Sequence, residues 1–189
     1  MQKVPAIALV CVLISGLLVA FPVVGYLTRD NNYYGFKTNL EVPPLPGYRP
    51  GNEQVRLVFF GYQHCGTVCP LQLVNLKKLQ RRLTNEPVRF VFVTLDPERD
   101  SQQELDRIMA GMGDGFYAVR PASQAAAQNL AMGFAEYAGK TGSGDHYDFD
   151  HSARIYAVTA DNRRQLLYAS PDLDLARVED DIQRLLSRH

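Results

Sequence analysis

The sequence predicts an α/β domain built on a mainly parallel sheet and preceded by an apolar N-terminal segment. Three patterns lead to this prediction. Two short apolar runs, at 55–62 and 88–96, have the continuity of strands buried on both faces, and each precedes a segment of helical periodicity. Two further apolar runs near the C-terminus are typical of a β-hairpin. The chain then ends in an amphipathic helix.

The composition fits one globular domain. The chain has 189 residues, of which 46% are hydrophobic, so it is long enough to bury a core. Its 20 basic and 20 acidic residues cancel. Because no overall field favours a polyanion, we expect no nucleic-acid partner.

The N-terminus departs from this profile. No charged residue occurs from Val4 to Leu27, and a helix of that length reaches about 36 Å, enough to cross a hydrocarbon core of about 30 Å. We expect residues 1–28 to be a membrane anchor or an uncleaved signal. A cleaved secretory signal is the alternative, although residues 23–25 make a poor cleavage site. Either predicts export, and the anchor predicts a single-pass inner-membrane protein whose soluble domain is periplasmic.

The segment 29–54 is predicted to be a Pro/Gly-rich linker or an edge cover, because its four prolines oppose helix and interior strand. The folded domain is therefore expected over 55–189. Pro70 suits the first turn of a helix that continues to about Leu83.

The remaining elements follow from capping and turn signals. The capping box SQQE at 101–104 opens a helix, 116–119 is a third strand candidate, and Ser123 can cap the Ala-rich helix after it. A polar loop is predicted at 141–152, followed by a β-hairpin over 153–170. This order predicts a thioredoxin-like fold with one extra α-β insertion.

Cys65 and Cys69 carry the clearest chemical signal. They lie between the first predicted strand and its helix, and ligands of open α/β sheets collect at such strand ends. A helix N-terminus favours thiolate, and in an exported domain the pair can cycle through a disulfide. We therefore expect a redox pair. Cys11 lies within the apolar span and is expected to be lipid-facing or buried.

Three residues separate the two cysteines, one more than in a plain dithiol oxidoreductase. The wider spacing still allows a disulfide and leaves room for a metal ion. His151 immediately precedes the first strand of the predicted hairpin, a loop that packs beside the cysteine-bearing helix in a thioredoxin-like architecture. Cys65, Cys69 and His151 form a set suited to copper, with Zn²⁺ as the main competitor.

The other histidines and the methionines are less informative. His64 adjoins Cys65 but should point away from it in an extended backbone, so its role as an accessory ligand is the less favoured interpretation. His146 and His189 are expected to be solvated. Three methionines on helical faces are expected in the core: Met109, Met112 and Met132.

Three segments carry a family resemblance. The strings VFFGYQHCGTVCP, VTLDPERDSQQEL and YDFDHSARIYAVTADNR resemble the three motifs of the SCO/SenC family over most of 55–189. The resemblance implies a membrane-anchored, thioredoxin-like protein that binds one copper ion, Cu⁺ or Cu²⁺, through Cys65, Cys69 and His151. Asp96 matches an acidic position near the site. Implied partners are the copper-bearing subunit of cytochrome c oxidase, other copper chaperones and thiol reductants.

The chain also departs from the family pattern. Gly66 and Thr67 stand where the family usually has Pro-Asp, and the segment before Val55 is shorter than the family's N-terminal β-hairpin. The resemblance predicts a metallochaperone rather than an enzyme, with thiol-disulfide oxidoreductase activity as the alternative. A peroxidase is a weaker alternative, for which Thr67 and Arg154 are loose candidates.

Overall fold

The computed structural model describes residues 33–144 and 146–188. The predicted anchor at 4–27 lies outside this range. Across the described residues, every helix is too short or too polar to traverse a bilayer.

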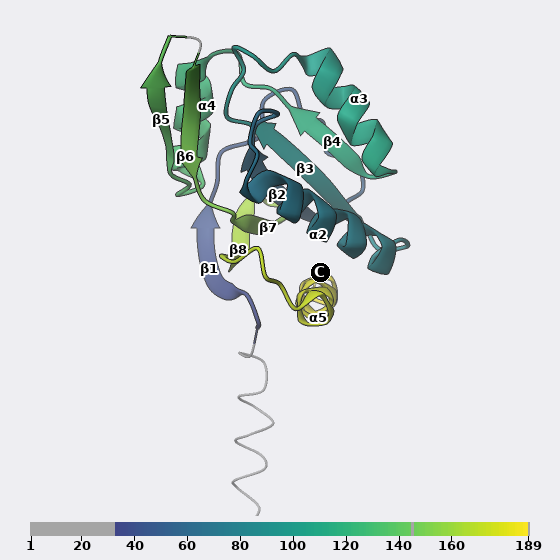
Figure 1. Cartoon of the computed structure of the whole chain (residues 1–189). Coiled ribbons are helices and arrows are strands. Elements are labelled where there is room, and N and C mark those ends of the chain that lie inside the picture. Colours follow the sequence, from purple (N-terminus) through teal and green to yellow (C-terminus); the bar gives the residue numbers. More distant parts are fainter. Residues whose placement is uncertain (1–32, 145, 189) are drawn as a thin grey trace, which may run out of the picture. The chain divides into compact units, whose positions relative to one another are not determined.

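Six strands form one mixed sheet in the order β1-β8-β7-β2-β3-β4 (Figure 1). Strands β2, β3 and β4 run parallel, whereas β7 is antiparallel to both β2 and β8. The predicted strands and C-terminal hairpin are confirmed. These are Val55–Gly61 (β2), Val88–Thr94 (β3), Phe116–Val119 (β4), Ile155–Thr159 (β7) and Arg163–Tyr168 (β8), whereas β1 (Phe36–Glu41) was not predicted as a strand.

Within residues 33–144 and 146–188, the helices are α2 (Val68–Arg82), α3 (Gln102–Met112), α4 (Gln124–Gly133) and α5 (Leu175–Leu186). The two predicted serine caps are confirmed. Ser101 Oγ accepts a hydrogen bond from the Glu104 amide, and Ser123 Oγ accepts one from the Ala126 amide, each at 3.2 Å. Each hydroxyl satisfies an amide that the first helical turn leaves without a partner.

The folded part begins before Val55, where the sequence analysis placed its start. Strand β1 pairs antiparallel with β8 and closes one edge of the sheet, which matches the edge cover rather than the linker. Val42 and Leu45 then pack into the core. Val42 directly precedes the first proline of the segment, and Leu45 lies between Pro44 and Pro46.

The polar loop predicted at 141–152 is instead part of a two-stranded sheet. Strands β5 (Ala138–Ser143) and β6 (His146–His151) form an antiparallel hairpin that is separate from the main sheet (Figure 1). The prediction was wrong because Phe149 is the one buried side chain among the described residues of the two strands. Without apolar alternation, this polar hairpin has the composition of a loop.

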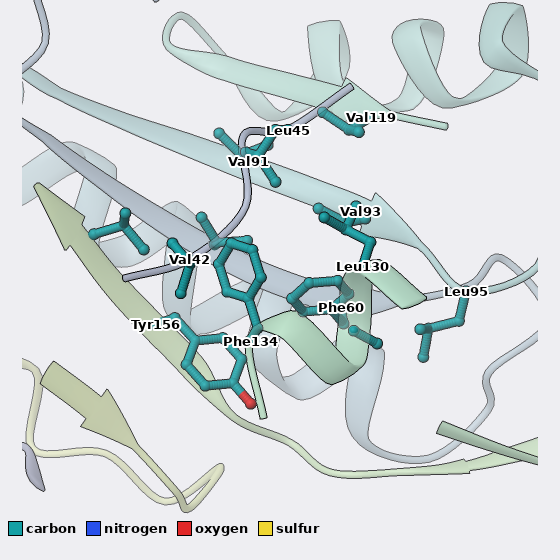
Figure 2. Packing of buried hydrophobic residues seen from close by; sticks show 13 residues of the cluster. Val42, Leu45, Phe60, Val91, Val93, Leu95, Val119, Leu130, Phe134 and Tyr156 are labelled. Atoms are coloured by element: carbon teal, nitrogen blue, oxygen red, sulfur yellow. The ribbon is translucent and has the colours of Figure 1, made fainter. Parts of the chain in front are cut away.

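One face of the sheet packs on a cluster of thirteen buried residues (Figure 2). At its centre the rings of Phe60, Phe134 and Tyr156 meet edge to face, with centroids 5.1–6.1 Å apart. Phe60 comes from β2, and the next residue, Gly61, is the last of that strand. The cluster therefore holds the strand from which the cysteine loop departs.

Candidate metal centre

Cys65 and Cys69 lie where β2 gives way to α2. Cys65 is in the connecting loop, where its amide donates to the Tyr62 carbonyl at 3.2 Å. Cys69 is the second residue of α2. Both cysteines are buried, and neither forms a disulfide in this structure. This agrees with their predicted position between a buried strand and the start of a helix.

His151 is the last residue of β6, and its ring faces both cysteines. Its Nε2 lies 3.5 Å from Cys65 Sγ and 3.6 Å from Cys69 Sγ. Its Nδ1 lies 2.9 Å from the Ser152 carbonyl oxygen. Because a carbonyl can only accept, Nδ1 carries a proton, and Nε2 is the ring nitrogen that faces the two sulfurs. The structure therefore brings the three predicted ligands together.

The separations fit an ion bound between the three atoms. With bonds of about 2.3 Å to sulfur and about 2.05 Å to nitrogen, the two donors stand about 3.6 Å apart at a tetrahedral angle and about 3.8 Å at a trigonal one. The observed 3.5 and 3.6 Å agree with the tetrahedral value. All three donor atoms lie within 4.8 Å of one another. The donor set is thus spaced to hold a metal ion.

Aromatic rings flank the imidazole. The buried Tyr62 ring lies edge to face with His151 at 5.6 Å, and Phe59 lies on β2 at 6.5 Å. The Tyr62 hydroxyl donates to the Asp148 carboxylate, which joins the hairpin to the cysteine loop. The sequence analysis missed Tyr62 and Asp148, although each belongs to a quoted motif.

The two thiols differ in acidity. Burial opposes ionisation of Cys65, but hydrogen bonds, the strongest of them with the Cys69 thiol, outweigh it and lower the pKa of Cys65 to about 6. Burial raises the pKa of Cys69 well above its usual range, and the Cys65 hydrogen bond raises it further. At neutral pH the pair therefore holds one thiolate and one thiol.

The two residues that depart from the family pattern are both exposed. Gly66 has open space around its Cα. Thr67 directs its hydroxyl toward the Cys65 sulfur, at 3.7 Å, and makes no side-chain cap to α2. The neutral Thr67 hydroxyl thus contacts the Cys65 sulfur at the position where the resemblance predicts a carboxylate.

His64 is exposed and lies apart from the sulfurs, as expected for an extended backbone. Its ring approaches carboxylate oxygens of Asp96 and Asp100 instead. Asp96 is fully buried, pairs with Arg99, and accepts a 2.8 Å hydrogen bond from Tyr147. Burial and this bond raise the pKa of Tyr147 to about 12. Asp96 therefore ties the β5–β6 hairpin to the loop after β3.

The expectations for the other histidines and for the methionines were confirmed at some positions and wrong at others. His146 is exposed and Met109 is buried, as expected, whereas His189 lies outside the described residues. Met112 is half-buried. The core prediction was wrong for Met132, which is 65% exposed near the end of α4. Arg154, the peroxidase candidate, donates to the Ala135 carbonyl.

The model of the SCO1/SenC family matches residues 51–187. The chain belongs to the SCO1/SenC family. It is 32% identical to the human mitochondrial SCO2 homolog over 110 residues, which are 56% of this chain and 41% of that protein. The chain thus spans less than half the length of this curated relative.

Solved structures confirm the thioredoxin-like SCO fold. The apo Sco1 protein from Thermus thermophilus is 30% identical, with a TM-score of 0.69 over 82% of this chain and 98% of that one. ScoI from Bradyrhizobium japonicum, solved with copper bound, is 22% identical, with a TM-score of 0.63 over 80% of this chain and 100% of that one. The family fold therefore covers the described part of the chain.

Proposed function

We propose that this chain binds one copper ion through Cys65, Cys69 and His151 and serves in the assembly of a terminal cytochrome c oxidase. The observation that carries the proposal is the donor set itself, with two sulfurs and one imidazole nitrogen at metal-ligand separations. Soft thiolates with imidazole suit copper, and Zn²⁺ is the main competitor. The copper-bound relative supports the same choice.

In this proposal the protein binds the copper ion temporarily and transfers it to a partner protein. Three donors leave one coordination position open, through which a ligand of a partner protein can enter before the protein ligands leave. His151 is only half-buried, so the imidazole side of the site is the accessible one. The partners proposed are the copper-bearing subunit of the oxidase and other copper chaperones.

Delivery of this kind takes place outside the cytoplasm. The uncharged run at 4–27 supports a single-pass anchor in the inner membrane, with the folded domain on the periplasmic side. In an oxidising compartment the cysteine pair can also cycle between the dithiol and the disulfide.

A thiol-disulfide oxidoreductase is the second candidate, favoured by the difference in thiol acidity. The Cys65 thiolate attacks one sulfur of a target disulfide and releases the other as a thiolate. Cys69 then loses its proton and attacks the Cys65 sulfur, which releases the second target sulfur and leaves a Cys65–Cys69 disulfide. Two electrons pass to the target, and a thiol reductant restores the pair. The oxidase's copper-site cysteines are the proposed substrate.

Copper titration of the reduced full-length protein tests the first proposal. We expect about one copper per chain at sub-micromolar free metal, retained in Cys11→Ser and lost in Cys65→Ser and Cys69→Ser. Wild-type protein that stays metal-free under these conditions would overturn it.

His151→Ala separates the two candidates. If delivery dominates, this variant loses oxidase assembly while its cysteine pair still cycles through the disulfide. If thiol reduction dominates, assembly survives the loss of the imidazole.

A further inference from the structure

Glu136 is a buried carboxylate close to the metal centre but outside it. It lies between α4 and β5 and is 3% exposed. Its oxygens accept hydrogen bonds from the Tyr156 hydroxyl at 2.6 Å and from the Ser152 hydroxyl at 2.7 Å, and the Ser152 amide donates at 3.2 Å. No ion pair involves Glu136 among the described residues.

Ser152 connects this carboxylate to the metal centre. Its amide and hydroxyl both donate to Glu136, and its carbonyl accepts from His151 Nδ1 at 2.9 Å. Every polar group of Ser152 is thereby engaged, and its amide and hydroxyl are held from the Glu136 side. A continuous chain of hydrogen bonds runs from Glu136 through Ser152 to the imidazole.

The hydrophobic core holds the Glu136 end of this series of hydrogen bonds. Tyr156 is fully buried and packs against Phe134 and Phe60 (Figure 2). Its hydroxyl donates to Glu136, so the carboxylate cannot move without disturbing the central ring cluster. A rigid support of this kind is what fixes a ligand's orientation.

We infer that Glu136 is a positioning residue that holds His151 in the Nδ1–H tautomer, with Nε2 free for the two sulfurs and a metal ion. The carbonyl of Ser152 selects this tautomer only while it points at Nδ1. Without Glu136, the Ser152 amide and hydroxyl lose their acceptor, and Ser152 can turn so that its carbonyl no longer faces Nδ1. The ring can then protonate at Nε2, where the proton blocks the lone pair. The metal part of this inference rests on the proposed function, whereas the tautomer does not.

Glu53 supplies a matched control. It is 5% exposed and likewise accepts from a tyrosine hydroxyl, Tyr48 at 2.9 Å, and from a backbone amide, Gly51 at 2.7 Å. It precedes β2, whereas Cys65 follows the other end of that strand. Its loss should destabilise the fold comparably and leave the imidazole unchanged.

The test is nitrogen-15 NMR of histidine-labelled, reduced, metal-free full-length protein, whose ring-nitrogen shifts report the tautomer. We expect Nδ1–H for His151 in the wild type and in Glu53→Val, and a mixture of both tautomers in Glu136→Val. Glu136→Gln keeps one acceptor oxygen for Ser152 and should fall between them. Copper affinity should follow the tautomer, with a loss of roughly tenfold in Glu136→Val.

An unchanged tautomer and affinity in Glu136→Val, with a stability loss like that of Glu53→Val, would overturn the inference. If Glu136→Val does not fold, Ser152→Ala carries the test, because it removes only the hydroxyl donor. Ser152→Ala should then shift the tautomer in the same direction, and an unchanged tautomer there also counts against the inference. A tautomer that depends on Glu136 in a protein that binds no copper would sink the proposed function and leave the positioning role intact.

Discussion

Gly61 lies directly against the sulfur of Cys69. A Cβ at Gly61 would stand 2.7 Å from Cys69 Sγ and 2.9 Å from a ring carbon of Phe92. Both distances are shorter than van der Waals contact, so this strand end has room for Cys69 only because position 61 has no side chain.

Gly61→Ala should therefore displace the Cys69 sulfur. We expect a loss of about 1–3 kcal/mol in the free energy of unfolding, from overpacking, together with weaker copper binding. Urea denaturation and competition with a copper chelator measure the two effects. Gly66→Ala is the control, because nothing lies within 4 Å of a Cβ there. Equal effects of the two substitutions would contradict the steric argument.

The acidity of Cys65 predicts a pH-dependent thiolate. In reduced, metal-free protein the ultraviolet absorbance of thiolate should rise by one group with a midpoint near pH 6, and Cys65→Ser should abolish this step. A midpoint near pH 8.5, the ordinary value for cysteine, would show that the hydrogen bonds do not act as described.

The same lowered pKa has a consequence for stability. Because the pKa of Cys65 is lower in the folded than in the unfolded chain, the folded state binds fewer protons between about pH 6 and about pH 8.5. The stabilisation is complete above the unfolded pKa and is lost as pH falls through the folded one. The pH dependence of urea unfolding in wild type, compared with Cys65→Ser, measures this contribution.

His151 and His64 should differ sharply on substitution. His151→Ala removes the nitrogen donor, so we expect loss of the Cu(II)–thiolate charge-transfer band, with Cu(I) partly retained by the two sulfurs. His64→Ala should leave both oxidation states close to wild type, because His64 lies beside Asp96 and Asp100. The reverse pattern in absorption spectra would mean that the wrong histidine has been assigned.

Asp181 should anchor the N-terminal edge of the fold. It is buried in α5 and accepts from the amides of Tyr34 and Gly35, at 3.0 and 2.8 Å. Asp181→Leu leaves these amides without their partner, and we expect a loss of about 1–3 kcal/mol in the free energy of unfolding. The neighbouring, exposed Asp180 is the control, and Asp180→Leu should change the unfolding midpoint little.

The sequence was sufficient where a local pattern dictates the element. Apolar continuity predicted β2 and β3, and two serines predicted the starts of α3 and α4. It failed for the β5–β6 hairpin, whose polar strands are held by contacts with distant residues, such as that of Asp148 with Tyr62. Neighbouring residues carry no signal for contacts of that kind.

The candidate site shows the same division. The cysteine pair was predictable from its place between a strand and a helix, and His151 from the architecture. Glu136 was not, because it is one acidic residue among many until the fold buries it against Ser152 and Tyr156. Met132 sits at a helical position like Met109 but is exposed, since periodicity alone does not say which side of a short helix is covered.

The distance along the chain between the ligands sets the order in which the site comes into being. His151 follows Cys65 by 86 residues and Cys69 by 82. During synthesis or passage across a membrane from the N-terminus, both sulfurs emerge long before the imidazole. Until His151 follows, the nascent chain can bind a metal ion through the two sulfurs alone. The third donor joins them once β6 has formed and the strands after it have paired. A metal ion that requires all three donors can therefore be held only after β6 has formed and His151 has reached the two sulfurs.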